Sequence, residues 1–274
     1  MPDMHTLCKD IDQAWEEFKN QVILCKKFMD SLGIEYDMGW RVVKDFYEKY
    51  EDKFKEIQSI LKKPILIEMW DKQTNYFITK IEFSVNDSTN KAATLATVQI
   101  DVENCQKYGI KYVDSDNKEK TPLLLHTSVS GAIERVIWAL LEHAADGKEK
   151  PSLPVWLSPI QVRFLPVSDE YVDYCLDLVE KLNSVGVRSD VDDIQSSIGK
   201  KIRNAEREWI PYIVVVGEKE VNSGLLSVRV RNKGMKEVSF EELKNEILDQ
   251  IKDYPKEKLC LPVRLSLRPR FYGG

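Results

Sequence analysis

A short charged segment, D-G-K-E-K-P-S at residues 146–152, separates two stretches of different pattern and constrains the fold more than any other feature. It combines charge, glycine and proline between two well-patterned regions, which is typical of a linker. A chain of 274 residues with 43% hydrophobic and 31% charged residues has the length and composition of two ordinary globular domains. We therefore predict one domain at 1–148 and a second at 149–274.

The region before this segment has the pattern of helices packed on a sheet. Apolar residues at helical spacing predict helices at about 8–33 and 43–61. Runs rich in β-branched and aromatic residues predict strands at 65–70, 76–85, 93–102 and 123–126, separated by polar turns. The first domain is therefore predicted to be α+β, with an antiparallel sheet.

The region after the segment alternates strands with helices. Strands are predicted at 162–167, 187–191, 212–216 and 225–230, and helices at 170–184, 198–208 and 240–251. Such alternation predicts an α/β domain with a mixed, largely parallel sheet.

Net charge and cysteine usage exclude several classes of protein. A net charge of -5 argues against a protein that coats nucleic acid indiscriminately, although lysine and arginine outnumber acids between Lys200 and Lys236. The five cysteines are scattered without a close pair, so we expect no disulfide framework and a reducing compartment. No signal peptide or bilayer-spanning apolar run is present, which predicts a cytoplasmic protein without membrane contact.

The stretch from Thr121 to His143 carries the strongest indication of a site. A short apolar run and a serine-rich turn precede a helical pattern with an apolar stripe that includes Ile133 and Ile137. Arg135 lies in the first helical turn, where a cation is mildly unfavourable unless an anion lies beside it. Gly131, Arg135 and free N–H groups could thus bind a phosphate. On its own, such a pattern is more often a core helix whose arginine reaches solvent.

Four short segments occur in the same order as in a known family, and the resemblance extends over nearly the whole chain. They read M-P-D-M-H-T-L-C at 1–8, A-T-V-Q-I-D at 96–101, L-L-L-H-T-S-V-S-G-A-I-E-R at 123–135 and L-P-V-W-L-S-P-I-Q at 153–161. They resemble class II aminoacyl-tRNA synthetases, specifically the archaeal-type threonyl-tRNA synthetases. In order they are similar to the segment after motif 2, the substrate-pocket strand, motif 3 and the junction into the anticodon-binding domain. The resemblance implies a partial, antiparallel class II catalytic core followed by an α/β anticodon-binding domain.

The resemblance implies roles for individual residues of the first domain. Arg135 would be the catalytic arginine that contacts ATP, with Gly131 beside it. The residues that would bind threonine are Asp3, Lys80, Thr97 and Gln99. The alternation of Thr97 and Gln99 suits a pocket, but it suits a solvated strand face equally well. Thr94 stands where many relatives have a glutamine near the nucleotide, which puts that contact in doubt.

His5 and His126 match the family's histidines that ligate zinc together with an upstream cysteine, which has no counterpart here. Cys8 is the first candidate for a substitute ligand. A Lewis acid bound by the amino group and hydroxyl of threonine would reject isosteric valine, which an apolar pocket does poorly. With two nitrogens and no thiolate, we expect weak zinc binding at most by this chain. Mg2+ would accompany ATP in the full enzyme.

The second domain matches the family's anticodon-binding positions at Gln195, Arg203, Glu220 and Arg229. Acid and guanidinium groups suit base edges in a splayed RNA loop. Gln195 replaces the asparagine of many relatives, which could shift local affinity. A surface that is merely charged is the usual alternative for such a region.

These patterns predict a portion of a threonine–tRNA ligase, which activates threonine with ATP and transfers it to tRNA(Thr). Motifs 1 and 2 and the family's editing domain are not seen in this sequence, so we expect the chain alone to be inactive. The full-length enzyme would be a homodimer. A non-catalytic tRNA-binding protein derived from a synthetase is the alternative, and an ATP-binding regulator without RNA is a third possibility.

Overall fold

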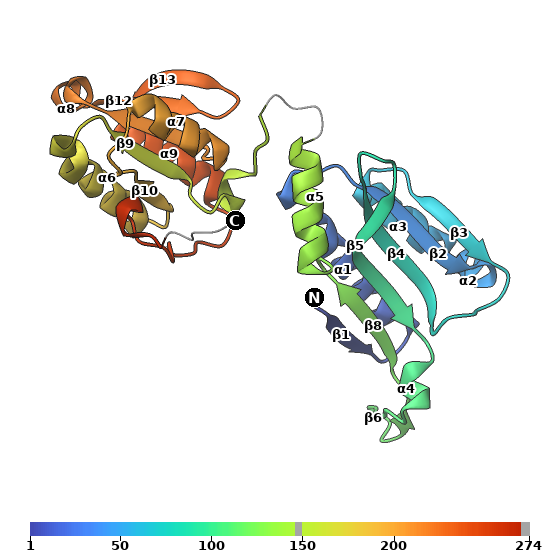
Figure 1. The fold of residues 1–274 in the computed structure, drawn as a ribbon. Helices are drawn as coiled ribbons and strands as arrows, with labels where there is room; N and C mark the ends of the chain where they lie inside the picture. Colours follow the sequence, from blue (N-terminus) through green and yellow to red (C-terminus); the bar gives the residue numbers. More distant parts are fainter. Residues whose placement is uncertain (146–149, 270–274) are drawn as a thin grey trace. The chain divides into compact units, whose positions relative to one another are not determined.

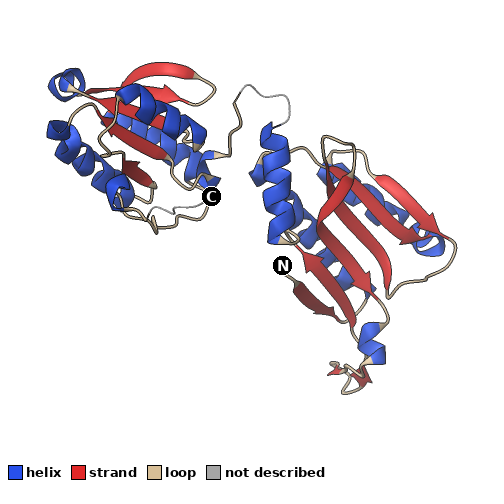
Figure 2. Ribbon diagram, in the orientation of Figure 1, coloured by secondary structure: helices blue, strands red, loops and turns tan. Residues whose placement is uncertain are grey.

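The computed structural model describes residues 1–145 and 150–269, which separate into two compact units, Met1–Asp146 and Gly147–Gly274 (Figure 1). The predicted boundary between 148 and 149 lies outside the described residues. Each unit contains its own sheet, and each is described by itself (Figure 2). Among the helices of the described residues, none has the length and apolarity needed to span a bilayer.

The first unit is built on a six-stranded sheet with the order β1-β8-β5-β4-β2-β3. Its strands are β1 (Met4–Cys8), β2 (Asp37–Val43), β3 (Leu66–Trp70), β4 (Phe77–Asn86), β5 (Ala92–Asp101) and β8 (Leu123–Ser128). Neighbouring strands are antiparallel except β2 and β3, which are parallel. Between β5 and β8 the chain forms α4 (Asn104–Lys107) and a small hairpin of β6 (Tyr112–Val113) and β7 (Glu119–Lys120).

The helices of the first unit are α1 (Ile11–Leu32), α2 (Lys44–Lys49), α3 (Glu51–Leu61) and α5 (Ile133–Ala145). The Asp10 carboxylate caps α1 by accepting from the Gln13 N–H, and Gly33 ends the helix with a left-handed φ of 66°. The buried side of α1 packs on β5 and β8 and contacts α3, so these helices cover one face of the sheet. The opposite face is left to polar side chains.

The segment predicted as one helix at 43–61 is a strand end and two helices. Met38, Trp40 and Val42 are buried alternately along β2, a period of two that belongs to a strand and was missed in the sequence. The helical part breaks at Tyr50, whose φ of -122° and ψ of 25° interrupt the helical geometry between α2 and α3. The predicted antiparallel sheet of four strands therefore gains two more, β1 and β2, and one parallel pairing, that of β2 with β3.

The apolar stripe of α5 is only partly buried, with Val136 and Leu140 half-buried and the rest exposed. Ile133, Ile137 and Leu141 are 66%, 51% and 48% exposed, while the buried residues of this helix are Ala139 and Ala144. The more buried side of the helix thus consists of Ala139 and Ala144 with the half-buried Val136 and Leu140. Periodicity located the helix correctly but marked only part of its buried side.

The second unit has a five-stranded sheet with the order β10-β9-β11-β12-β13. Its strands are β9 (Val162–Pro166), β10 (Ser189–Val191), β11 (Tyr212–Val216), β12 (Leu225–Val230) and β13 (Gly234–Ser239). The pairings of β9 with β10 and β11 are parallel, and those of β12 with β11 and β13 are antiparallel. The sheet is mixed as predicted, but it is not largely parallel, because β13 was missed.

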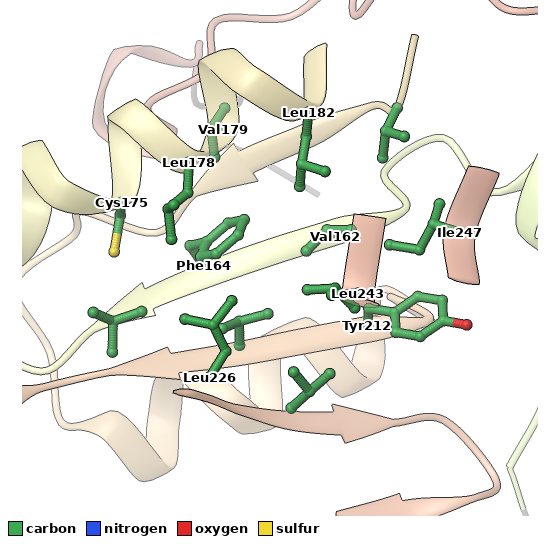
Figure 3. Close-up of a cluster of buried hydrophobic side chains, with 14 of the residues drawn as sticks. Val162, Phe164, Cys175, Leu178, Val179, Leu182, Tyr212, Leu226, Leu243 and Ile247 are labelled. Atoms are coloured by element: carbon green, nitrogen blue, oxygen red, sulfur yellow. The ribbon is translucent and has the colours of Figure 1, made fainter. Parts of the chain in front are cut away.

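Helices cover both faces of this second sheet. They are η1 (Val155–Leu157), η2 (Asp169–Tyr171), α6 (Val172–Ser184), α7 (Ile198–Arg207), α8 (Glu218–Ser223), α9 (Phe240–Ile251) and η3 (Leu265–Leu267). Phe164, Leu226 and Leu243 belong to the core that the sheet forms with α6 and α9 (Figure 3). A smaller core joins Ile213 to Ala205 of α7 on the other face.

The segment after α9 returns to the free edge of β10. The Val191 N–H donates to the Val263 carbonyl at 3.0 Å, and Asp190, which is fully buried, accepts from Arg268 at 2.8 Å. Arg163 of β9 donates to both oxygens of the same carboxylate, each at 2.8 Å. The buried Asp190 carboxylate thus links β10, β9 and the C-terminal segment through hydrogen bonds.

Candidate functional site

The open face of the first sheet carries a row of polar side chains because strand residues alternate between faces. Lys80 of β4 lies opposite Gln99 of β5, and Glu82 lies opposite Thr97. On the other side of Gln99 comes His126 of β8. The alternate residues of these strands are mostly buried toward the helices.

These side chains line a cavity of about 490 Å³ within the first unit. The predicted residues that line it are Asp3, Lys80, Thr97, Gln99, His126, Gly131 and Arg135. Glu82 and Thr94 line it as well. His5 does not line the cavity, although it pairs with His126 across the sheet. The fold therefore gathers residues that are far apart in the sequence, such as Asp3 and Arg135, around one space.

The turn between β8 and α5 requires a glycine. Gly131 has a left-handed φ of 73°, and a Cβ atom there would lie 2.4 Å from the carbonyl oxygen of Leu95. Its N–H donates to the Ser128 hydroxyl at 3.1 Å. The close approach to β5 fixes where α5 begins, and with it the position of Arg135.

Arg135 extends along the cavity from the first turn of α5. Its Nη1 donates to the Thr94 carbonyl at 2.8 Å, which holds the guanidinium over β5. That bond uses one of the five N–H donors of the side chain. A guanidinium held in this way is suited to bind an anionic ligand with its other donors.

Lys80 is held by an acidic neighbour that sequence reasoning missed. Its Nζ lies 2.7 Å from Glu82 Oε1, and Arg41 Nη1 of β2 lies 3.4 Å from the same oxygen. Arg41 Nε also pairs with Glu68 of the edge strand at 3.0 Å. The signal was present in the sequence, because Lys80 and Glu82 are two residues apart on a strand and must share a face.

The two histidines lie close together but have different partners. The rings of His5 and His126 are 4.7 Å apart in an edge-on arrangement. His5 Nε2 is 3.8 Å from Asp3 Oδ2, whereas His126 Nε2 is 2.8 Å from Asp101 Oδ2. Tyr76 approaches His126 from another side, with ring centroids 5.4 Å apart.

Asp101 is buried and fully hydrogen-bonded. Its Oδ1 accepts from the backbone N–H groups of Glu103 at 2.8 Å and Asn104 at 2.9 Å. Burial by itself raises the pKa of Asp101, but the bonds from Asn104, His126 and Glu103 outweigh it and lower that pKa below the ordinary value. In the sequence this carboxylate is only the last residue of the strand segment 96–101, and no role was predicted for it.

The donor set around the histidines does not form a complete zinc site in the described part of the chain. No group of three or more His, Cys, Asp and Glu side chains that could hold a metal is found in residues 1–145 and 150–269. Cys8 cannot serve as the third ligand, because it lies three residues from His5 on β1 and so points to the opposite face, where it is fully buried. Burial also raises the pKa of its thiol to about 11, which disfavours the thiolate that zinc binds.

In the second unit, Gln195 and Glu220 lie at the end of the sheet where β9, β10 and β11 have their carboxyl ends. Gln195 follows β10, and its Nε2 donates to Asp169, which follows β9, at 3.1 Å. Glu220 lies in α8, which follows β11. Since β9, β10 and β11 are parallel, their carboxyl ends meet at this end, the usual place for ligands in such sheets.

Glu220 is engaged inside the protein. It is 7% exposed, its Oε2 accepts from the Gly217 N–H at 3.0 Å, and its Oε1 accepts from the Ser227 hydroxyl at 2.6 Å. Burial raises the pKa of Glu220, but these hydrogen bonds outweigh it and lower the pKa overall. The predicted base-reading acid thus also closes the first turn of α8.

Arg229 lies on the same face of β12 as Ser227, two residues further along the strand. It lines a cavity of about 250 Å³ together with Lys150 and Glu206, and its Nη1 is 3.5 Å from Glu206 Oε1. Arg203 is exposed on α7. The four predicted anticodon residues are therefore spread over an end of the sheet, a helix and a sheet face, and they do not converge on one cavity.

The basic region between Lys200 and Lys236 is less exposed than its charge suggests. Lys201 is buried, and its Nζ donates to the carbonyls of Pro166 at 3.0 Å and Asp192 at 2.8 Å. Arg231 donates to the carbonyls of Pro151 and Glu206. The cations that remain exposed on α7 are Lys200, Arg203 and Arg207. Their spacing of three and four residues places them on one side of the helix.

A family model described as "tRNA synthetase class II core domain (G, H, P, S and T)" matches residues 1–144, just over half of the chain. The chain belongs to the class II tRNA synthetases. Residues 161–250 of this class II chain match a second family model, "Anticodon binding domain". The predicted fold class, a partial class II core followed by an anticodon-binding domain, is confirmed.

Similar class II proteins are threonine–tRNA ligases. The enzyme of Pyrococcus horikoshii is 50% identical over 281 residues, which cover 100% of this chain and 45% of the relative. That of Thermococcus kodakarensis is 49% identical over 280 residues, with the same coverage. The chain therefore spans less than half the length of these curated relatives. The resemblance to threonyl-tRNA synthetases is confirmed.

Among solved class II structures, the RNA-binding domain of threonyl-tRNA synthetase from Cryptosporidium parvum is similar in fold. The TM-score is 0.73 at 22% sequence identity, and the match covers 90% of this chain and 63% of the other. At this identity the similarity supports the fold alone.

Proposed function

We propose that the chain acts as part of a threonine–tRNA ligase, in which its first unit binds threonine and ATP and its second unit binds the anticodon of tRNA(Thr). The observation that carries this proposal is the cavity of about 490 Å³ around which the sheet gathers Asp3, Lys80, Thr97, Gln99 and Arg135. Relatives named threonine–tRNA ligase support the choice of substrate.

The cavity offers complementary groups to the two substrates. Arg135 would bind the phosphates of ATP, with Gly131 providing the space where the chain turns into α5. Thr97 and Gln99 would hydrogen-bond the polar groups of threonine, and Asp3 would receive its ammonium group. Lys80, held by Glu82, would neutralise a carboxylate or phosphate oxygen. Mg2+ bound with ATP would supply further charge neutralisation in the complete enzyme.

Zinc is not assigned a step in this proposal, because His5 and His126 supply two nitrogens where a protein zinc site uses three or four ligands. Binding of zinc by the chain is expected to be weak. We further propose that the complete enzyme acts in the cytoplasm and as a homodimer, as the family resemblance implies.

Titration of the 274-residue chain with ATP and with threonine tests the assignment of the cavity. Arg135→Ala should weaken ATP binding by about 1.5–3 kcal/mol, the usual worth of a hydrogen bond to a charged group. Arg207→Ala, which removes an exposed guanidinium in the second unit, is the control and should leave ATP binding unchanged. Equal losses in both variants would remove the nucleotide from this cavity.

Exchange of pyrophosphate into ATP tests whether the chain suffices for the chemistry. We expect no threonine-dependent exchange above background, because groups that act as a unit lose nearly all activity when some are missing. Exchange abolished by Arg135→Ala would show that the chain is a complete adenylating unit. A chain that binds tRNA but neither ATP nor threonine would favour a non-catalytic tRNA-binding protein.

Filter binding with tRNA(Thr) and an anticodon-swapped tRNA tests the second unit. Arg229→Ala should cost about 1–3 kcal/mol for tRNA(Thr) alone if its guanidinium contacts a base edge. Lys200→Ala should weaken both RNAs equally and reduce the salt dependence, as expected for a phosphate contact. Equal effects of Arg229→Ala on the two RNAs would limit the second unit to electrostatic binding.

A further inference from the structure

We propose that Asp101 is a positioning residue, which fixes the His126 imidazole as the Nε2–H tautomer and leaves the lone pair of Nδ1 to bind a ligand in the cavity. The assignment of a ligand to this cavity rests on the proposed function. The tautomer follows from the contacts of Asp101 alone and can be tested separately.

The Asp101 carboxylate already accepts hydrogen bonds on both of its oxygens. Oδ1 accepts from two backbone N–H groups, and Oδ2 accepts from Asn104 Nδ2 at 2.6 Å. The side chain is fully buried and cannot turn away without breaking these bonds. A carboxylate in this state can only accept, so the bond of 2.8 Å to His126 Nε2 requires the proton to be on that nitrogen.

The ring of His126 is also restrained on its flanks. Tyr76 and His5 contact it edge-on, with centroids 5.4 Å and 4.7 Å away. Tyr76 is itself anchored, since its hydroxyl donates to Gln99 Oε1 at 2.8 Å. The ring is thus held by a carboxylate behind it and by two rings beside it, while His126 lines the cavity.

This arrangement determines which chemistry His126 can offer. A neutral imidazole whose Nε2–H is donated has one lone pair left, on Nδ1. That lone pair can accept a hydrogen bond from an ammonium or hydroxyl group, or it can coordinate a divalent transition cation. In either case Asp101 acts through His126, as carboxylates do behind ligating histidines.

The substitution Asp101→Asn distinguishes positioning from simple support. The retained carbonyl oxygen can still accept from Glu103 and Asn104, so the turn after β5 keeps its backbone bonds. The new amide NH2 would face His126 and donate to Nε2, which would shift the proton to Nδ1 and remove its lone pair. Asp116→Asn, at an exposed position of the β6–β7 turn, is the matched control.

Nitrogen-15 NMR of the histidine rings provides the first readout, since the two tautomers give different shifts at Nδ1 and Nε2. We expect the Nε2–H form for His126 in the unaltered chain and in Asp116→Asn, and the Nδ1–H form in Asp101→Asn. The unaltered chain alone decides the first part. A predominant Nδ1–H form there would overturn the proposal, whether or not Asp101→Asn folds.

Titrations with Zn2+ alone and with threonine alone provide the second readout. A shift of the His126 Nδ1 signal with Zn2+ would identify a metal ligand, and we then expect Asp101→Asn to weaken Zn2+ binding by about 10–100-fold. A shift with threonine only would identify the amino acid as the ligand. If neither moves the signal, the ligand-binding part of the proposal is wrong, although binding of tRNA(Thr) would still support the proposed function.

Discussion

Replacement of Gly131 by alanine should destabilise the first unit and displace the arginine of the cavity. The residue has a φ of 73°, and its new Cβ would lie 2.4 Å from the Leu95 carbonyl oxygen, where ordinary contacts begin near 3.4 Å. That oxygen is backbone in an inner strand of the sheet, so the clash can be relieved only by moving the β8–α5 turn or β5 itself. Thr94, whose carbonyl accepts the Arg135 hydrogen bond, is the preceding residue of β5.

Two terms set the size of the effect. A left-handed conformation costs a residue with a Cβ atom about 1–2 kcal/mol. Overpacking of a tight contact adds about 1–3 kcal/mol. We therefore expect Gly131→Ala to lower the free energy of unfolding of the first unit by about 2–5 kcal/mol.

Gly109 provides the control, because it has a similar φ of 65° but no atom lies within 4 Å of the place that a Cβ would occupy. Gly109→Ala should cost only the conformational term, about 1–2 kcal/mol. Urea unfolding followed by tryptophan fluorescence measures both variants, since Trp15 and Trp40 are buried in the first unit. Equal losses for the two variants would refute the close-contact argument, and unchanged ATP binding by Gly131→Ala would refute the link to Arg135.

Three further predictions concern buried ionisable groups. Asp190→Ala leaves Arg163 and Arg268 without their shared anion and should lower the free energy of unfolding of the second unit by about 3–5 kcal/mol, measured by urea unfolding; a loss below 1 kcal/mol would contradict this. The pKa of Glu220 is lowered in the folded state, so the ionised carboxylate stabilises the second unit. The difference in free energy of unfolding between the unaltered chain and Glu220→Gln should be complete above the ordinary pKa of 4.5 and disappear as pH falls through the folded-state pKa. A difference that stays constant across acid pH would be evidence against this. Thiol labelling at pH 8 should modify the exposed Cys260 much faster than the four buried cysteines. Rapid labelling of two or more thiols would argue against that burial.

Local pattern predicted much of the fold because alternation and helical spacing record which side of an element is buried. β12 and α9 occur where predicted because each has a clear period, and β11 does because it is a short continuous apolar run bounded by turn residues. β2 was missed because its buried residues Met38, Trp40 and Val42 run into the helical pattern of α2. β13 was missed because it is largely exposed and has weak alternation.

The residues of the site were predicted, but the hydrogen bonds and ion pairs that hold them were not. The resemblance indicated Lys80, Gln99 and His126. Glu82 could have been predicted from its place two residues after Lys80 on one strand, whereas the contact of Asp101 with His126 joins two strands that are distant in the sequence. The buried residues of α5 are Ala139 and Ala144, and a periodicity of large apolar residues does not report small ones. The internal hydrogen bonds of Glu220 depend on Ser227, which belongs to the next strand.

The pairing of the C-terminal segment with β10 determines when this strand edge is covered during synthesis. Arg163 and Asp190 are made well before Val263 and Arg268, yet these later residues cover the outer edge of β10 in the part of the chain that the structure describes. A growing chain therefore exposes an open strand edge for as long as those residues remain inside the ribosome. Stalled nascent chains ending before Arg264 should be cut by protease near β10, and chains extended until Arg268 has emerged should resist.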